Sequence, residues 1–510
     1  MTGEATAGCH GKTKARALLR LYAARDDAAH VHRATMARVD VAPRPRRRPR
    51  RHPWLAVFYG ALGVQLQLPE LAATLFLLTH LRMEVAALAA FQATLILPWC
   101  LKPLFGLLSD TYPLAGGRRR APYIVLGNVV LAAVWTALAR IAHADADVHV
   151  VEALLLAASV ATCGIDVMYD SLLVVCTQRE GPDDHGSRQA QCWAARAAGA
   201  LVSAAAGGAL LQVVTPSTVF ALVACVSVGT GVLAAATLYV DEVRVPSGAA
   251  AATSACRTRV RALCRAFRTP ALWRPALFVF VFAATPSSGD ALFAFLVQDL
   301  HFTPATLGML GFVRHAAMLV GTGVFYRCCR FARYRRFFAL VVVISAVLGA
   351  TPVVLVTHWN RRLGIPNVFF AAGDDLFLSV VGQIALMPIL VLAAKLAPRG
   401  VEAGLYASFV SVLNFAGLVS GYGGAVLTNA FGVTRDNFTR LMPLVLTCTA
   451  TSLLALLALP LLPRGNVRDV VHATAAAATE ARPAAVVDDD DDKSDDDGRS
   501  PLMLLEVASV

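Results

Sequence analysis

Residues 95–127 have the sequence LILPWCLKPLFGLLSDTYPLAGGRRRAPYIVLG, in which charged residues interrupt an apolar segment. Lys102 lies inside the first apolar run, Asp110 lies at its end, and the basic residues 118–120 directly precede the second run. A charge inside a membrane-spanning helix costs about 2.5–3.5 kcal/mol on insertion scales, so it is expected to face a partner or a cavity. The segment therefore indicates two membrane helices joined by a short basic link.

The rest of the chain is equally apolar. Of its 510 residues, 57% are hydrophobic and 16% are charged, whereas about a quarter of the residues are charged in soluble domains. Twelve apolar runs are long enough to cross a hydrocarbon core about 30 Å thick as helices, and none alternates as a barrel strand does. We therefore expect an all-α membrane protein whose twelve transmembrane helices are residues 54–79, 86–108, 122–141, 150–175, 190–212, 217–240, 273–298, 306–326, 336–357, 368–395, 401–428 and 440–463.

Basic residues determine the predicted topology. Segments 42–52, 116–120, 257–268 and 326–336 are rich in arginine and fall on one side of an alternating twelve-span arrangement. By the positive-inside rule, both termini are expected in the cytosol. The net charge of +12 is then explained by topology and by contact with anionic lipid, so nucleic-acid binding is disfavoured. No organelle signal stands out; the plasma membrane is the expected location and an organelle membrane is the alternative.

A long polar interval divides the apolar runs into six and six. The fifth run of each group carries a similar small-residue sequence, AGALVSAAAGGAL at 198–210 and AGLVSGYGGAVL at 416–427. Parallel six-helix repeats are typical of the major facilitator architecture, in which the substrate site lies between the repeats. Close packing of small-residue helices is the alternative explanation. The expected domains are a basic cytosolic tail (1–52), an N-terminal six-helix bundle (53–240), a cytosolic central loop (241–272), a C-terminal six-helix bundle (273–463) and a disordered acidic cytosolic tail (464–510).

Two aspartates and an arginine lie within predicted spans of the N-terminal bundle. Asp166 and Asp170 are four residues apart and therefore share one helix face. Arg196 lies about 9 Å along the next predicted helix, at a similar depth. Two interpretations remain open. The residues form a structural Asp/Arg ion pair, or one aspartate is incompletely neutralised and carries a coupling proton or contacts substrate.

The predicted C-terminal bundle contains a deeper charge. Arg314 lies about 12 Å from the outer end of its span, with apolar residues on both sides. Asp290 is expected at a comparable depth, and Asp374 and Asp375 enter span ten from the same side. Arg314 either neutralises Asp290 or binds a substrate carboxylate, because a guanidinium makes a two-pronged contact with that group. His315 is either a titratable group or simply a hydrogen-bonded residue.

The opening stretch also contains a charge motif. Lys102 either extends its side chain towards the cytosol or faces the two aspartates of span four. A glycine, an aspartate and clustered basic residues between spans two and three resemble the signature of the major facilitator superfamily. The glycine is expected to permit close helix approach, and the charges to form a latch that favours one of two alternating-access states. The residues of this predicted latch are Gly106, Asp110, Arg118, Arg119 and Arg120.

Several stretches together resemble the folate/biopterin transporter family. Asp166 and Asp170 match the paired aspartates of that family, and residues 187–199 and 398–414 are similar to its segments at spans five and eleven. The resemblance extends over about residues 54–463. In the opening stretch it lies in Pro98-Trp99, Lys102-Pro103, Gly106, Ser109-Asp110, Pro113, Gly116 and Pro122-Tyr123.

The resemblance adds candidate residues, and the sequence also departs from the family pattern at some positions. It adds Glu402 and Asn414 to the candidates for substrate binding or proton coupling. Gly117 stands where an aromatic residue is expected, and Arg314-His315 matches no pattern of the family. The role of Arg314 therefore rests on its depth in the membrane alone.

The function that the resemblance implies is secondary transport of folate or pteridine solutes by alternating access, with proton symport. Arg314 or Arg196 would pair with a folate carboxylate, and Asp170 or Asp290 would accept hydrogen bonds from the pterin ring. The alternatives are S-adenosylmethionine or another small metabolite as substrate, or a non-transporting receptor paralogue.

The sequence disfavours other classes of protein. No Gly-x-x-x-x-Gly-Lys-Ser/Thr motif occurs, which disfavours ATP as the driving force. The histidines are scattered, so neither an enzyme nor a metal site is expected. We expect a monomer without a cofactor, whose partners are the solute, protons and membrane lipid.

Overall fold

The computed structural model describes residues 54–112, 114, 118–142, 146–177, 187–241, 261, 268–329, 332–395 and 402–465. The chain divides into two units, Met1–His52 and Pro53–Val510, and every described residue belongs to the second. The predicted central loop and the two predicted tails lie almost wholly outside the described residues. The division into domains therefore stays a prediction.

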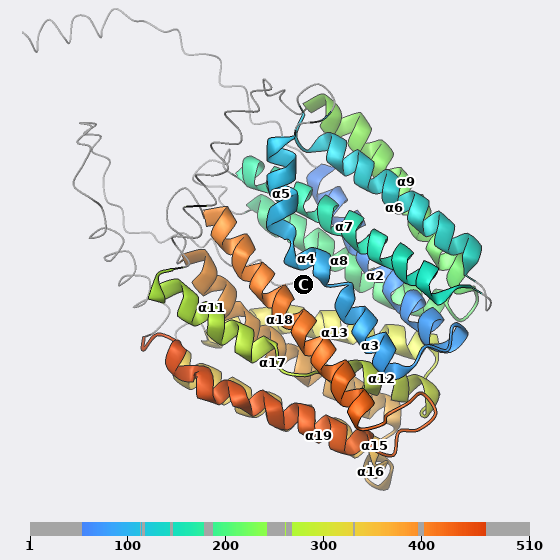
Figure 1. Cartoon of the computed structure of the whole chain (residues 1–510), viewed down its shortest axis with the longest axis vertical. Coiled ribbons are helices and arrows are strands. Elements are labelled where there is room, and N and C mark those ends of the chain that lie inside the picture. Colours follow the sequence, from blue (N-terminus) through green and yellow to red (C-terminus); the bar gives the residue numbers. More distant parts are fainter. Residues whose placement is uncertain are drawn as a thin grey trace, which may run out of the picture. The chain divides into compact units, whose positions relative to one another are not determined.

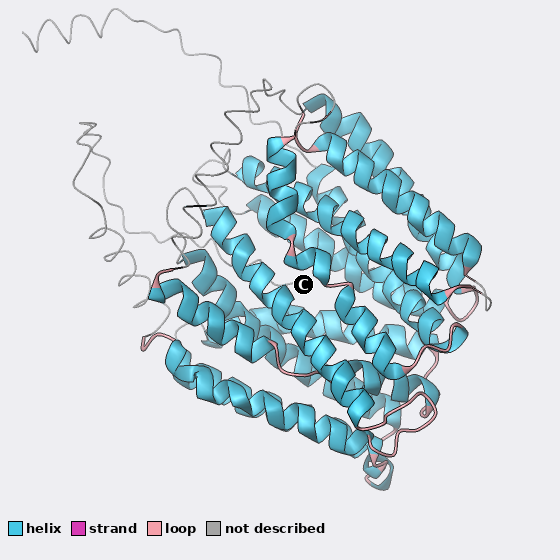
Figure 2. Ribbon diagram, in the orientation of Figure 1, coloured by secondary structure: helices cyan, strands magenta, loops and turns pink. Residues whose placement is uncertain are grey.

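Helices make up nearly all of the described residues, and no β-strand occurs among them (Figure 2). The N-terminal helices are α2 (Trp54–Leu75), η1 (Phe76–His80), α3 (Val85–Thr94), α4 (Leu97–Cys100), α5 (Lys102–Thr111), α6 (Ala121–Ile141), α7 (Val148–Thr177), α8 (Ser187–Leu210) and α9 (Pro216–Asp241). The C-terminal helices are α11 (Pro270–Ala283), α12 (Gly289–Gln298), α13 (Pro304–Val324), η2 (Phe325–Cys329), α14 (Tyr334–Ala350), α15 (Pro352–Val356), α16 (Trp359–Arg362), α17 (Asn367–Lys395), α18 (Glu402–Ala430), α19 (Leu441–Ser452) and η3 (Leu453–Leu461).

Within the described residues, ten helical segments are long and apolar enough to cross a membrane, and they coincide with ten of the twelve predicted spans. The predicted span 190–212 is helix α8, which begins with the polar sequence SRQAQ and is less apolar than the others. The predicted span 273–298 forms two shorter apolar helices, α11 and α12, separated at residues 284–288. The all-α membrane fold is confirmed, and the two remaining spans are helical but shorter or more polar.

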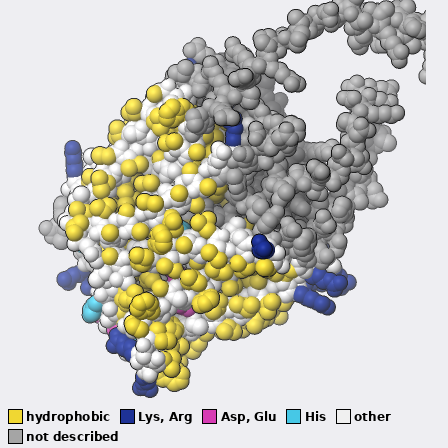
Figure 3. Space-filling view, turned by 180° about the vertical axis from the view of Figure 1, so that it is seen from behind, with side chains coloured by type: hydrophobic (Ala, Val, Ile, Leu, Met, Phe, Trp, Pro, Cys, Tyr) yellow, Lys and Arg dark blue, Asp and Glu magenta, His cyan; other side chains and the backbone are white. Residues whose placement is uncertain are grey.

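Apolar side chains cover the outside of the described helices. Figure 3 shows hydrophobic side chains over most of the visible described face, with Lys and Arg mainly at its margins. Large residues such as Val129, Phe369 and Leu457 are exposed. Such side chains are stable next to lipid tails rather than water. Together with the ten spans, this surface identifies a multi-pass membrane protein.

Prolines break the second span into the short helices α3, α4 and α5. Pro98 and Pro103 lie in the first turns of α4 and α5, and proline has no backbone N–H to donate to an earlier carbonyl group. Side chains of α7 bind two carbonyl groups of the broken segment. Ser159 Oγ donates to Leu95 O at 2.7 Å, and Cys163 Sγ donates to Pro98 O at 3.3 Å. The turn is thus held against α7, and this contact positions the first residue of α5.

Helix α2 packs against α8 and α9, and α6 packs against α9 and α7 (Figure 1). Glycine allows the closest of these contacts. A Cβ atom added to Gly63 of α2 would lie 2.2 Å from the carbonyl oxygen of Arg196, so only glycine fits this position. The backbone of α8 therefore lies directly on α2, and this contact brings Arg196 into the interior of the N-terminal helices.

The N-terminal and C-terminal helices meet where α8 packs against α13, and where α3 and α4 pack against α18 (Figure 1). At the first contact, a Cβ on either Gly208 or Gly308 would lie 2.6 Å from the Cα atom of the other. At the second, a Cβ on Gly421 would lie 2.7 Å from that of Ala93. The small residues of the two similar sequences therefore serve close helix packing in this structure.

Candidate functional site

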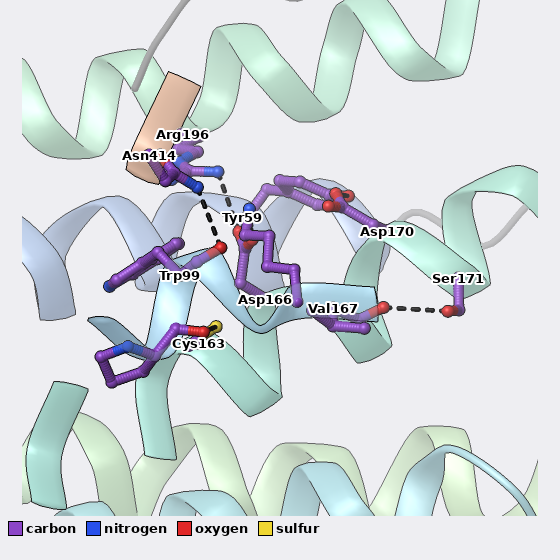
Figure 4. Close-up of polar contacts among 11 residues, drawn as sticks. Tyr59, Trp99, Cys163, Asp166, Val167, Asp170, Ser171, Arg196 and Asn414 are labelled. Carbon is purple, nitrogen blue, oxygen red and sulfur yellow. Dashed lines mark hydrogen bonds and ion pairs between the residues drawn. The ribbon is translucent and has the colours of Figure 1, made fainter. Parts of the chain in front are cut away.

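Charged side chains from α5, α7 and α8 meet among the N-terminal helices (Figure 4). Asp166 of α7 is fully buried and is bound by two cations. Lys102 Nζ lies 2.6 Å from its Oδ2 atom, and Arg196 Nη1 lies 2.9 Å from its Oδ1 atom. Asp170, one helical turn further, accepts a hydrogen bond of 2.8 Å from the hydroxyl group of Tyr59. We refer to Lys102, Asp166, Asp170, Arg196 and Tyr59 as the buried charge cluster.

Lys102 faces Asp166 instead of extending towards the membrane surface, which decides between the two orientations left open by the sequence. Its Nζ atom also lies 4.8 Å from the ring centre of Trp99. The guanidinium carbon of Arg196 lies 5.3 Å from the ring centre of Trp193. Aromatic faces stabilise cations that have left water. The cluster holds two cations and two carboxyl groups, so its formal charge is zero when both carboxyl groups are ionised.

The two aspartates of α7 have different partners. Both cations bind Asp166, so this carboxylate is neutralised by close ion pairs. Asp170 has the neutral hydroxyl of Tyr59 as its partner, and no cation among the described residues lies within ion-pair distance of it. The ion pair expected from the sequence is therefore formed by Asp166 with Arg196, and Asp170 is the aspartate without a cation.

Asn414 of α18 binds the backbone of a different helix (Figure 4). Its Nδ2 atom donates to the carbonyl oxygen of Trp99 at 3.0 Å, and the residue is 9% exposed. Its amide is thus occupied by the turn that leads into α5. Asn414 therefore connects a C-terminal helix to the segment that carries Lys102.

A second group of polar residues comes from α2, α13 and α17. Arg314 Nε of α13 lies 3.2 Å and 3.3 Å from the two carboxylate oxygens of Asp375 in α17. His315 Nε2 lies 2.8 Å from Gln67 Oε1, and Gln67 Nε2 donates to Glu70 at 2.7 Å. Gln67 thus links Glu70 to His315, the neighbour of Arg314 in the chain. We refer to Gln67, Glu70, Arg314, His315 and Asp375 as the exposed polar cluster.

This second cluster is accessible although it lies within helices of membrane-spanning length. The side chain of Arg314 is 51% exposed, and Glu70 is also exposed. Asp375 binds only the Nε atom of the Arg314 guanidinium. No described residue binds the two terminal nitrogens of Arg314. An arginine with two open terminal NH2 groups and a nearby carboxylate can bind a solute that carries both an acid and hydrogen-bond donors.

The other acidic candidates of the C-terminal helices lie apart from Arg314. The structure pairs Arg314 with Asp375 in place of Asp290, so the pair expected from similar depth does not form. Asp290 lies in the first turn of α12, beside the break between α11 and α12, and no described residue forms an ion pair or hydrogen bond with its side chain. Asp374 accepts a hydrogen bond from Thr351. Successive residues of a helix point about 100° apart, so Asp374 and Asp375 face different neighbours.

The predicted latch is only partly described. Gly106 of α5 lies against α7, but a Cβ there would be 3.7 Å from Val167 Cγ1, an ordinary contact. The expected close helix approach is therefore not present at Gly106, because the side chain of Val167 fills the space between the helices. The arginines Arg118, Arg119 and Arg120 are half-buried directly before α6. The side chains of Asp110 and Glu402 lie outside the described residues, and the latch stays a prediction.

Sequence reasoning missed three residues of α2 that belong to the clusters, namely Tyr59, Gln67 and Glu70. Glu70 carries a detectable signal, because it is an acidic residue inside the predicted span 54–79, in the sequence LQLPELA. The insertion cost that singles out Arg314 applies to it as well. Tyr59 and Gln67 carry no comparable signal, since uncharged polar side chains are tolerated in many spans.

Comparison with known protein families gives a match over most of the chain. A family model described as the BT1 family matches residues 62–481. A protein of Synechocystis sp. named folate-biopterin transporter is 37% identical over 417 residues, which are 81% of this chain and 81% of that protein. A Plasmodium falciparum protein named folate transporter 2 is 24% identical over 383 residues, 74% of this chain and 81% of that one.

Solved transporter structures share the fold. The nucleoside transporter NupG superposes with a TM-score of 0.58 at 12% identity, over 80% of this chain and 96% of NupG. The POT family transporter PepTSo gives a TM-score of 0.59 at 11% identity, over 85% of this chain and 99% of PepTSo. The D-xylose-proton symporter gives 0.56 at 11% identity, over 80% and 97% of the two chains. These likenesses confirm the major facilitator type of fold.

Proposed function

The chain belongs to the BT1 family, and on that basis we propose that it is a secondary transporter of folate- or pteridine-type solutes. The family model covers residues 62–481, which include every residue of the exposed polar cluster and all of the buried charge cluster except Tyr59. Relatives that match over most of their length carry the names folate-biopterin transporter and folate transporter. The family match over most of the chain is the observation that carries this proposal.

Substrate recognition is assigned to the exposed polar cluster. A folate joins a flat pterin ring to a tail that bears carboxylates. The two open terminal NH2 groups of Arg314 suit a carboxylate, and Glu70 is placed to accept hydrogen bonds from the amino and ring N–H groups of a pterin. Glu70 takes this role in place of Asp170, because Asp170 is bound to Tyr59 in the interior of the N-terminal helices.

Proton coupling is assigned to Asp170. Both cations of the buried charge cluster bind Asp166, so a proton on Asp170 leaves their ion pairs intact. Protonation changes the formal charge of the cluster from zero to plus one, and release of the proton restores zero. A charge change among packed helices gives the two states of a transport cycle different stabilities. Substrate and proton then enter together, with both termini in the cytosol.

Uptake into cells that lack their own transporters tests this function. Cells that express the chain are given labelled folate, biopterin or S-adenosylmethionine, and the initial uptake rate is measured with and without a proton ionophore. Saturable uptake of folate or biopterin that the ionophore abolishes is the expected result. Normal amounts of the protein at the cell surface without saturable uptake of any of the three would identify a non-transporting receptor and contradict the proposal.

S-adenosylmethionine is the second candidate substrate, favoured by the acidic residues Glu70 of α2, Asp290 of α12 and Asp374 of α17. Its sulfonium cation would bind these carboxylates in preference to Arg314. The initial uptake rates of labelled folate and labelled S-adenosylmethionine separate the two candidates. Saturable uptake of folate without uptake of S-adenosylmethionine is expected, and the reverse result would favour the sulfonium solute.

A further inference from the structure

The carbonyl oxygen of Trp99 lacks the donor that a continuous helix would supply. In an α-helix this oxygen accepts the N–H of the residue four positions later, which is Pro103 and has no N–H. The amide of Asn414 donates to it at 3.0 Å instead. Asn414 is 315 residues further along the chain, on α18. A C-terminal helix thus supplies a hydrogen bond that the N-terminal segment cannot make for itself.

The same broken segment offers two bonds for comparison. Ser159 donates to Leu95 O and Cys163 donates to Pro98 O, and both donors belong to α7. The broken segment is therefore held by its own N-terminal neighbours at two carbonyl groups and by α18 at the third. Of these three bonds, the one from Asn414 depends on how the N-terminal and C-terminal helices meet.

The bond from Asn414 lies next to the buried charge cluster. Trp99 carries the accepting carbonyl, and its ring centre lies 4.8 Å from Lys102 Nζ. Lys102 Nζ in turn lies 2.6 Å from Asp166 Oδ2. A displacement of the turn therefore moves Lys102 relative to the carboxylate that it neutralises.

We propose that Asn414 is a positioning residue that holds Lys102 on Asp166 while α18 lies against α4. When α18 moves away from α4 during transport, the Trp99 carbonyl loses its donor and the turn that carries Lys102 is released. The ion pair between Lys102 and Asp166 in the buried charge cluster thereby depends on the contact between the N-terminal and C-terminal helices. This inference rests on the proposed transport function, and it gives Asn414 a role other than contact with substrate.

Asn414→Leu removes the donor and nearly keeps the side-chain volume. A buried acceptor without a partner is costly, so the initial rate of labelled folate uptake is expected to fall about tenfold. The pH profile of uptake is expected to shift, because Lys102 is no longer held on Asp166. Ser159→Ala is the matched control, since it removes a hydrogen bond to the same broken segment from an N-terminal helix. Equal effects of the two variants on the pH profile would overturn the inference.

Pro103→Ala tests the missing donor directly, because alanine supplies the N–H that a continuous helix would donate to the Trp99 carbonyl. In the double variant Asn414→Leu/Pro103→Ala, most of the lost uptake rate and the original pH profile are expected to return. A double variant that is no better than Asn414→Leu alone would show that Asn414 does not act through this carbonyl group.

A measurement without substrate keeps this inference separate from the proposed function. Gln212 and Thr303 lie at the contact of α8 and α13, where their side chains are hydrogen-bonded at 3.4 Å. Gln212→Cys and Thr303→Cys together allow a cross-link in membrane vesicles that reports the conformation described here. Asn414→Leu is expected to lower its yield several-fold relative to Ser159→Ala, even if the protein carries no folate. An unchanged yield contradicts the inference, whatever the uptake assay shows.

Discussion

The buried charge cluster and the exposed polar cluster contain similar side chains in opposite settings. In the first, the side chains of Asp166 and Arg196 are 0% and 7% exposed, and each carboxylate oxygen of Asp166 has a close cationic partner. In the second, the side chain of Arg314 is 51% exposed and binds Asp375 through one of its three nitrogens. Charged groups that are fully paired with one another stabilise a conformation. A charged group with unused hydrogen-bond donors can bind a solute.

The two clusters also differ in the free energy that is lost when one ion-pair partner is removed. Removing one partner from a buried ion pair costs about 3–5 kcal/mol, because the remaining charge stays unpaired in a poorly hydrated interior. An exposed pair is worth about 0–1 kcal/mol, since water replaces the lost partner. The two clusters should therefore respond differently to the same substitution.

Asp166→Asn is expected to have the largest effect. It leaves Lys102 and Arg196 buried without a carboxylate, and the expected loss of folding free energy is about 3–5 kcal/mol. The measurement is the apparent Tm and the yield of monodisperse protein in detergent. Asp375→Asn is the matched control and is expected to cost less than about 1 kcal/mol. Similar losses in both variants would remove the distinction between the clusters.

A variant that touches neither cluster sharpens the comparison. In Gly208→Ala the added Cβ would lie 2.5 Å from Pro304 O and 2.6 Å from the Cα atom of Gly308. Overpacking of this kind costs about 1–3 kcal/mol, and here it destabilises the contact of α8 with α13. The maximal uptake rate is expected to fall while the KM for folate stays unchanged. Gly229→Ala is the control, because nothing lies within 4 Å of its added Cβ. A raised KM in Gly208→Ala would contradict this account.

Arg314→Lys keeps the charge but loses the two-pronged geometry of the guanidinium. The KM for folate is expected to rise about tenfold, which corresponds to about 1.4 kcal/mol, while the apparent Tm is unchanged. Arg361→Lys is the control, since Arg361 is exposed and donates from Nε to Asn367 at 3.2 Å. An unchanged KM in Arg314→Lys would make Arg314 a counter-ion of Asp375 and nothing more.

Glu70→Gln is expected to have the smallest effect of the series. The amide keeps one acceptor and loses one charge, so the affinity for biopterin should fall about threefold, as for the loss of one hydrogen bond of ~0.5–1.5 kcal/mol. Competition of biopterin with labelled folate measures this affinity. The exposed Glu84 provides the control variant Glu84→Gln. Equal inhibition of wild type and Glu70→Gln would place the pterin ring elsewhere.

Much of the fold and part of the site could be predicted from the sequence. The apolar runs determine the helices, and the insertion cost of charges identifies Asp166, Asp170, Arg196 and Arg314 as residues that need partners. The pairing of Asp166 with Arg196 follows from their similar depth on adjacent spans. These inferences succeed because depth in the membrane can be counted directly along a helix.

The details that the sequence left open or missed depend on the rotation of helices and on breaks within them. Lys102 reaches Asp166 because prolines interrupt the second span, and the direction of the chain after a break cannot be counted from residue spacing. Depth alone favoured Asp290 as the partner of Arg314, but the break between α11 and α12 precedes Asp290, and Asp375 on α17 faces α13 instead. Asn414 and Trp99 are 315 residues apart in the chain, and residue spacing does not show which distant helices meet.

The pH dependence of folate uptake in Asp170→Asn, measured beside Arg314→Lys, tests the central claim that the two clusters divide coupling from recognition. Asp170→Asn is expected to make the uptake rate nearly independent of external pH with little change in KM, because its side chain cannot exchange a proton. Arg314→Lys is expected to raise KM and to keep the wild-type pH profile. If Asp170→Asn retains the wild-type pH profile, or if both variants change KM and pH profile alike, the division of roles is wrong.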